Sequence, residues 1–140
     1  SCNNLGLDIR FKTNIKEKIW DKFIFLSAYS GFTTLEEKSI GEIFDDTNLR
    51  RKFINAMKET FELSKTFNVS FSKDPIETWL EKIEKMPYQM TSSMYLDFKN
   101  SKKLELDWLS GYIVNLGKSK KINFPTHNEI VEGIKIKQSF

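Results

Sequence analysis

Apolar residues recur at three- and four-residue spacing along most of the chain, which is typical of amphipathic helices. The first such segment, residues 16–29, has large apolar residues on more than one side, which predicts a buried central helix. Gly31 is suited to end this helix, because glycine tolerates the left-handed conformation of a C-cap. Thr34 and Glu37 then have capping-box spacing and predict a short second helix that ends near Phe44.

The clearest helical segment begins at one of three capping residues, Asp46, Thr47 or Asn48, and runs to about Phe67. Its apolar positions fall on one face: Leu49, Phe53, Ile54, Ala56, Met57 and Phe61. A further helix is expected after Asp74, which is followed by a proline at the first helical position and a glutamate at the third. Met86-Pro87 is expected to stop that helix.

Three more helices are expected toward the C-terminus. The first begins at one of the hydroxyl residues 91–93 and runs through residue 97, and the second spans residues 104–116 with Gly117 at its end. The third follows the capping-box spacing of Thr126 and Glu129. Strand signals are poor, because the short alternation at residues 68–72 lies between strong helices and is expected to be a connector.

Composition agrees with one folded domain over residues 1–140. The chain is 39% hydrophobic and 29% charged, and no repeat or linker divides it. The expected fold is therefore all-α, a compact bundle of about six or seven helices. The aromatic content is unusual, with 12 Phe, 4 Tyr and 3 Trp, or 14%.

Charge and cysteine content exclude several classes of function. There are 22 basic and 19 acidic residues, and the net charge of +3 is too small to indicate a nucleic-acid surface. Cys2 and His127 are the only cysteine and histidine, so neither an internal disulfide nor a structural zinc site is expected. The single cysteine fits a reducing environment, so a cytoplasmic location is expected. No apolar run has the length of a membrane span, so no membrane partner is expected.

The glycines argue against a nucleotide loop within this chain. They do not form G-x-G-x-x-G or a P-loop: Gly6, Gly31, Gly41, Gly111, Gly117 and Gly133. We therefore expect no cofactor-binding and no metal-binding residues here. Because the chain begins at Ser1 without a methionine, we also expect it to be a fragment or a processed product of a longer protein.

Lys22 is the first candidate for chemistry, because it lies between Trp20 and Phe23 in the most apolar segment. A lysine that is desolvated there could serve as an acid or base near neutral pH. The simpler interpretation is a lysine that extends along the edge of an apolar face with its charge in water. From the residues alone the simpler interpretation is favoured.

Two later segments offer polar groups. Thr91, Ser92 and Ser93 place hydroxyls at an expected helix N-terminus, where anions such as carboxylates are attracted, although simple capping is the more common role. Glu105 could accept a hydrogen bond from a substrate hydroxyl, or it could only stabilise the helix dipole. His127 is expected to be a surface or loop residue without a catalytic role. The methionines of the central region are expected to fill the core: Met86, Met90 and Met94.

Four short segments together resemble a known family. They occur in this order: Ile19-Trp20-Asp21-Lys22-Phe23, Ser92-Ser93-Met94-x-x-Asp97, Glu105-Leu106-Asp107-x-Leu109-x-Gly111 and Phe124-Pro125-Thr126-x-Asn128. In order and spacing they resemble the C-terminal helical domain of ketopantoate reductases, over roughly residues 5–136. The fold implied by the resemblance is that of this domain, which is similar to the C-terminal domain of 6-phosphogluconate dehydrogenase.

The resemblance implies a function for the longer protein. In this family an N-terminal Rossmann domain, which is absent from this chain, binds NADPH, and the helical domain closes over a small 2-keto acid. The product is a 2-hydroxy acid such as pantoate, on the route to pantothenate and coenzyme A. By the resemblance, Lys22 donates the proton, Ser93 helps to hold the substrate carboxylate together with Ser92, and Glu105 binds the substrate's terminal hydroxyl. The catalytic role of Lys22 is now favoured, and the resemblance leaves room for a homodimer.

The sequence departs from the family at three positions that often carry Asn, namely Leu26, Ser30 and Ser110. The loss of these amides removes hydrogen bonds to substrate and lysine, so a different 2-keto acid is an alternative substrate. A second alternative is a helical interaction module with no catalytic role, since the chain has no nucleotide loop and is rich in aromatic residues. Under the reductase hypothesis, part of the aromatic surface meets the nucleotide-binding domain, and this chain alone is expected to be inactive.

Overall fold

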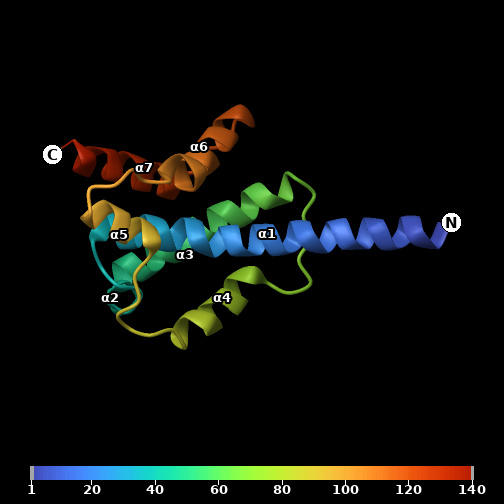
Figure 1. Ribbon diagram of the computed structural model, residues 1–140, viewed down its shortest axis with the longest axis horizontal. Helices are drawn as coiled ribbons and strands as arrows, with labels where there is room; N and C mark the ends of the chain where they lie inside the picture. Colours follow the sequence, from blue (N-terminus) through green and yellow to red (C-terminus); the bar gives the residue numbers. More distant parts are fainter. Residues whose placement is uncertain (1, 140) are drawn as a thin grey trace.

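The structure is a computed structural model that describes residues 2–139, and in that range it consists of helices joined by loops (Figure 1). The elements are α1 (Cys2–Glu36), α2 (Ile40–Asp45), α3 (Thr47–Lys65), α4 (Pro75–Glu84), α5 (Ser93–Lys99), the 3-10 helix η1 (Leu106–Trp108), α6 (Ser110–Ser119) and α7 (Pro125–Gln138). No strand occurs within residues 2–139, so the predicted all-α fold is confirmed. No helix in that range is both long and apolar enough to cross a membrane.

Helix α1 is the central element of the domain. Figure 1 shows α6 and α7 on one side of it and α4 on the other, and α3 packs along its length. Ile24, Ala28 and Phe32 are fully buried in these contacts. Phe25 stacks on Trp79 of α4 with ring centroids 4.4 Å apart. The predicted buried central helix is therefore confirmed, although it is longer than residues 16–29.

The predicted end of this helix at Gly31 is wrong. The helix continues through Gly31 to Glu36, and a Cβ atom at Gly31 would lie 2.8 Å from the side chain of Ile130 in α7. The glycine therefore permits close approach of two helices and does not form a C-cap. The chain turns instead at Glu37, which has φ 54°.

The predicted capping box at Thr34 and Glu37 is also wrong, because Thr34 is buried inside α1. The box forms five residues later, at the start of α2. There the Ser39 hydroxyl accepts from the Glu42 N–H at 3.3 Å, and the Glu42 carboxylate accepts from the Ser39 N–H at 3.1 Å. Glu37 has another role, since its carboxylate accepts from Lys99 at 2.6 Å.

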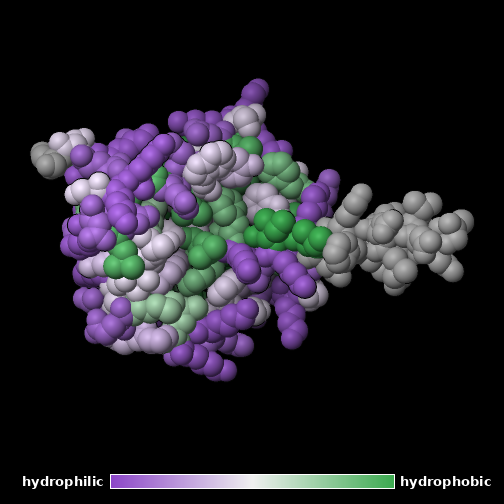
Figure 2. Space-filling model, viewed as in Figure 1, coloured by the Kyte–Doolittle hydropathy of each residue, from purple (hydrophilic) through white to green (hydrophobic). Residues whose placement is uncertain are grey.

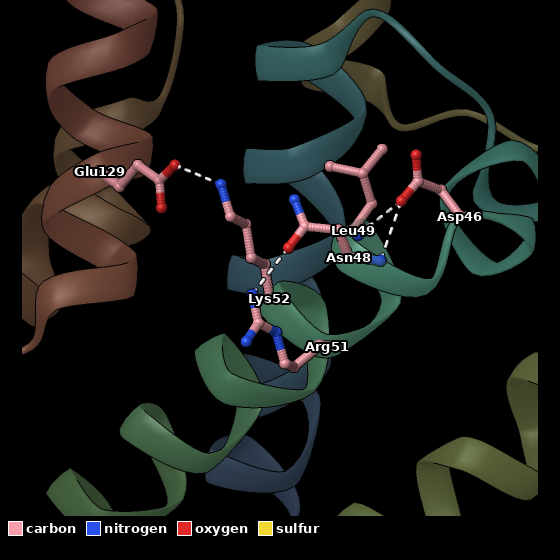
Figure 3. A network of polar contacts seen from close by, with 6 residues as sticks. All are labelled: Asp46, Asn48, Leu49, Arg51, Lys52 and Glu129. Atoms are coloured by element: carbon pink, nitrogen blue, oxygen red, sulfur yellow. Dashed lines mark hydrogen bonds and ion pairs between the residues drawn. The ribbon is translucent and has the colours of Figure 1, made fainter.

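Helix α3 begins where capping chemistry predicts. Asp46 is the N-cap, and one of its carboxylate oxygens accepts from the N–H groups of Asn48 and Leu49 at 2.9 and 3.1 Å (Figure 3). Lys52, one turn further along, donates to Glu129 of α7 at 2.7 Å and so links the two helices (Figure 3). Asp74 caps α4 in the same way, by accepting from the Ile76 N–H at 2.9 Å.

The predicted helix over residues 104–116 is interrupted. Residues 106–108 form η1, and Leu109, with φ −116° and ψ −107°, separates it from α6. Gly117 lies inside α6 and does not end it, because a Cβ there would meet the ring of Phe124 at 2.6 Å. The predicted methionine core is confirmed: Met94 is buried, and Met86 and Met90 pack against the same core.

The start of α7 is capped by another helix and not by its own capping box. Both oxygens of the Glu59 carboxylate in α3 accept backbone N–H groups, from Thr126 and His127, each at 2.9 Å. The predicted box between Thr126 and Glu129 therefore does not form, and Glu129 pairs with Lys52 instead.

His127 is fully buried, so its expected place on the surface or in a loop is wrong. Its Nε2 lies 2.8 Å from the carbonyl oxygen of Ala56, and its Nδ1 lies 3.0 Å from the Ser110 hydroxyl. Because a carbonyl can only accept, the hydrogen-bond network assigns the proton to Nε2, and Nδ1 accepts from Ser110. The neutral imidazole thus joins α3, α6 and α7.

The same network reaches the central helix. The Thr60 hydroxyl lies 3.0 Å from His127 Nε2 and 3.2 Å from the Ser27 hydroxyl of α1. Burial lowers the pKa of His127 from its ordinary value of 6.5 to about 4, because the charged form would be desolvated. The network therefore contains a histidine that is neutral at physiological pH.

This burial predicts a pH dependence of stability. The unfolded chain takes up a proton at His127 below about pH 6.5, whereas the native state does so only near pH 4. The contribution of neutral His127 to the free energy of unfolding is therefore fully present above pH 6.5, and it falls by about 3 kcal/mol as the pH drops to 4. Urea unfolding at several pH values should show this loss. The His127→Gln variant has no group that titrates at this position, so its free energy of unfolding should decrease less over this pH range, by about 3 kcal/mol. An identical pH dependence in the two proteins would contradict the lowered pKa of His127.

Candidate functional site

The candidate site is built on one face of α1. Lys22, Leu26, Ser30 and Thr33 follow one another at four-, four- and three-residue spacing, which places them on one side of the helix. Between Ile24 and Thr34, Leu26 is the only exposed residue, with 42% of its surface accessible. We call these four residues the α1 strip. Its Lys22 end is open to solvent, and its Thr33 end is buried.

Helix α5 is attached to the buried end of the α1 strip. The Ser92 and Thr33 hydroxyl oxygens lie 2.6 Å apart, and Thr33 also donates to the carbonyl of Tyr29 at 2.6 Å. Ser92 must therefore donate to Thr33, and its oxygen accepts from the Tyr95 N–H at 3.1 Å. Both functions of the Ser92 hydroxyl are used within the protein, which is the capping role considered from the sequence. The next residue, Ser93, is exposed.

A second segment borders the open end of the strip. Glu105 immediately precedes η1 and is exposed, and Trp108 at the end of η1 has 75% of its surface accessible. Ser110 begins α6, and its hydroxyl oxygen lies 3.5 Å from the carbonyl of Ser27 in α1, although its proton is donated to His127. The three polar candidates Lys22, Ser93 and Glu105 thus come from three segments, of which α5 is fixed to α1 by the hydrogen bond between Ser92 and Thr33.

An apolar groove lies between α1 and the η1–α6 segment. It has a volume of about 580 Å³ and is lined by Ile19, Trp20, Lys22, Phe23, Leu26, Trp108 and Tyr112. Lys22 is the only charged side chain among the described residues of that lining. Figure 2, in the same view as Figure 1, shows hydrophobic side chains gathered along α1 and flanked by hydrophilic ones.

Aromatic contacts hold the base of the groove in place. Trp20 packs edge-to-face on Phe23 with centroids 5.6 Å apart, and it stacks on Phe67 at 5.5 Å. Phe23 packs edge-to-face against Tyr112 of α6 at 6.0 Å. These geometries are favourable for aromatic pairs, so the groove is formed without a ligand.

The structure changes the interpretation of two residues. Lys22 is exposed, so it is not desolvated in the way its apolar sequence neighbours suggested. Ser110 is buried and its hydroxyl is bonded to His127, so its side chain contributes to the core of the domain rather than to the surface of the groove.

Sequence reasoning missed the walls of the groove. Ile19, Trp108 and Tyr112 were not among the candidate residues, yet all three are exposed and line the groove. The spacing of Ile19, Lys22 and Leu26 could have indicated a shared face with a charge in its middle. The contribution of Trp108 could not be found in this way, because the break at Leu109 decides its direction.

A different groove lies between α3 and the residues that lead into α7. Its volume is about 720 Å³, and its lining mixes both charges, with Lys58, Glu59, Glu62 and Lys65 on the α3 side. Glu59 is already occupied in capping α7. This groove, which we call the α3 groove, contains none of the candidate residues.

Among the described residues, no group of three or more possible metal-ligating side chains occurs. The sequence has no glycine-rich phosphate loop, and residues 2–139 have no strand from which such a loop could emerge.

Comparison with known proteins gives three kinds of likeness. The family model described as "Ketopantoate reductase PanE/ApbA C terminal" matches residues 14–138. A 2-dehydropantoate 2-reductase of Aquifex aeolicus is 27% identical over 139 residues, which are 96% of this chain and 44% of that protein. A dimeric ketopantoate reductase from Staphylococcus aureus has the same fold, with a TM-score of 0.81 at 19% identity over 89% of this chain and 43% of that one.

One further solved structure carries a different name. A D-mandelate dehydrogenase, solved with NADH and anilino(oxo)acetate, has a TM-score of 0.79 at 19% identity over 90% of this chain and 42% of that one. The chain therefore spans less than half the length of each of these proteins. Since the family model covers nearly all of the sequence, the chain belongs to the family of ketopantoate reductase C-terminal domains.

Proposed function

We propose that this chain is the substrate-binding C-terminal domain of an NADPH-dependent reductase that converts a 2-keto acid to a 2-hydroxy acid. The observation that carries the proposal is the place of Lys22, the one charged side chain among the described residues that line an apolar groove. The resemblance of its segment to the family supports the role of the catalytic lysine for it. 2-Dehydropantoate is the reference substrate, because it is the substrate in the names of relatives such as the Aquifex enzyme. D-mandelate dehydrogenase, with the same fold, shows by its name that other 2-hydroxy acids are candidates.

The chemistry assigned to Lys22 is proton donation. A nicotinamide cofactor held by another domain would supply the hydride to the keto carbon and be oxidised in doing so. The keto oxygen takes a proton from the Lys22 ammonium, and solvent returns one to the amine. Before that transfer, the ammonium stabilises the negative charge that grows on the oxygen. Its exposed position at the open end of the α1 strip leaves the Nζ atom accessible to a small ligand.

The other polar residues hold the ends of the substrate. Ser93 is exposed at the start of α5 and offers its hydroxyl to the substrate carboxylate. Glu105, exposed before η1, accepts a hydrogen bond from a substrate hydroxyl. Ser92 acts through position, because its hydroxyl joins α5 to Thr33 and so determines where Ser93 lies.

The proposed partners are a Rossmann domain of the same polypeptide and a second copy of the protein. The exposed groove residues Ile19, Leu26 and Trp108 are suited to face a domain that binds the cofactor. A homodimer is supported by the Staphylococcus relative, which is described as dimeric. A purely structural interaction module is the competing proposal. A G-x-G-x-x-G segment after a strand upstream of residue 1 in the gene would favour the reductase.

Removal of the lysine tests the proton donor. In the full-length protein, Lys22→Ala should lower kcat for 2-dehydropantoate by about 10²–10⁴-fold, because general acid catalysis and charge stabilisation are both lost. The measurement is NADPH oxidation followed by absorbance. Lys18→Ala, which removes an exposed lysine one turn earlier on α1, should leave the rate unchanged. Equal rates in Lys22→Ala and the unsubstituted protein would refute the assignment.

The proposal that another domain binds the cofactor predicts that the 140-residue chain alone neither binds NADPH nor reduces a substrate. Because it has no phosphate loop, it should show no NADPH binding in titration calorimetry and no reductase activity. The full-length protein should bind the cofactor under the same conditions. Micromolar affinity of the isolated chain for NADPH would show that the cofactor site lies at least partly within these residues.

A further inference from the structure

We infer that the groove beside Lys22 selects 2-keto acids with a bulky apolar, preferably aromatic, side chain over 2-dehydropantoate. This inference rests on the proposed function and concerns the substrate class of the same site. It is carried by three features of the groove: the residue one turn beyond Lys22, the aromatic walls, and a lining that includes no carboxylate or amide among the described residues.

The first feature is Leu26. It lies one turn, roughly 6 Å, beyond Lys22 on the same face of α1, and it is the one exposed residue between Ile24 and Thr34. A substrate whose keto oxygen contacts the Lys22 ammonium therefore places neighbouring atoms against the Leu26 methyl groups. An apolar substituent gains from this contact, whereas a hydroxyl would lose hydrogen bonds to water without replacement.

The second feature is the pair of aromatic walls from η1 and α6. Trp108 and Tyr112 both line the groove and both have large exposed surfaces. Phe23 packs edge-to-face against Tyr112 at 6.0 Å, which fixes the orientation of that ring. Such a wall favours stacked or edge-to-face packing of an aryl group, and a groove of about 580 Å³ has room for one.

The third feature concerns where a substrate hydroxyl could be bound. Ser30, the next residue of the α1 strip, is buried, and the Ser110 hydroxyl is bonded to His127. Glu105 is not part of the groove lining, so the contact proposed for its carboxylate lies outside the groove. A terminal hydroxyl that enters the groove meets Leu26 and aromatic rings whose polar atoms are the Tyr112 hydroxyl and the indole N–H groups, and no carboxylate or amide in the lining replaces its hydrogen bonds to water.

The charge of Lys22 argues for a small anionic ligand rather than a closely packed protein surface. No described residue forms an ion pair with the Lys22 ammonium, although it lies among six apolar or aromatic lining residues. A protein surface packed flat over the groove would bury this charge and would have to supply an acid for it. A 2-keto acid carries its own carboxylate and an oxygen that accepts from the ammonium.

The test compares two substrates in the full-length protein with NADPH. We expect kcat/KM for phenylglyoxylate to exceed that for 2-dehydropantoate by about tenfold or more. Leu26→Asn, which puts an amide at this position, should reduce that ratio by about tenfold, because kcat/KM falls for phenylglyoxylate and rises for 2-dehydropantoate. Ile136→Asn is the matched control, since Ile136 is an exposed aliphatic residue of α7 outside the groove, and it should leave the ratio unchanged.

The outcomes separate this inference from the proposed function. A preference for 2-dehydropantoate in the unsubstituted protein, or an unchanged ratio in Leu26→Asn that retains its circular dichroism spectrum, overturns the inference while the reductase stands. Absence of NADPH oxidation with either substrate overturns the proposed function and the inference together. Trp108→Ala gives a second readout, because it should raise KM for phenylglyoxylate several-fold more than KM for 2-dehydropantoate.

Discussion

The burial of α1 is the constraint on which the rest of the domain depends. From Ile24 to Thr34 every residue of this helix except Leu26 is buried or nearly so, because helices pack against it from several directions. A helix that is covered in this way can contact a ligand only through the part of its surface that remains exposed. That part begins at Leu26 and extends back to Lys22 and Ile19. The position of the candidate site is thus a consequence of how the core is filled.

The polar interior of the domain fixes the walls of this opening. His127 accepts from Ser110, the first residue of α6, and the Thr60 hydroxyl that it contacts lies beside Ser27 of α1. Movement of α6 relative to α1 would break these contacts in a dry environment, where unpaired polar groups are costly. The network therefore stabilises the position of η1 and α6, which carry Trp108 and Tyr112. Ser92 and Thr33 do the same for α5 at the other end of the strip.

Local signals in the sequence were sufficient to predict the contacts that a residue makes with its neighbours in the sequence. Asp46 and Asp74 cap the helices that follow them, as their spacing predicts, because an N-cap contact depends on two or three adjacent residues. The predictions for Gly31, Gly117 and Thr126 were wrong because distant partners decide these positions. Ile130 and Phe124 need the space that the two glycines leave, and Glu59 of α3 caps α7.

The candidate site could be predicted only in part for the same reason. Periodicity places Lys22 and Leu26 on one face, and the family resemblance indicates a role for the lysine. Neither the periodicity nor the resemblance shows that Leu26 is the one exposed residue between Ile24 and Thr34. Neither shows that the irregular backbone at Leu109 brings Trp108 to the same groove. His127 was misread because a lone histidine carries no periodic signal, and its three hydrogen-bond partners come from other helices.

The most direct test of the placement of the site is a crystal structure of the full-length protein with its cofactor and an unreactive 2-keto acid analogue. The ligand should lie at the open end of the α1 strip, with its keto oxygen or the equivalent atom within hydrogen-bond distance of Lys22 Nζ and its side chain against Leu26. A ligand bound elsewhere, for example in the α3 groove, with Lys22 in solvent, would contradict the assignment of this face of α1 as the substrate site.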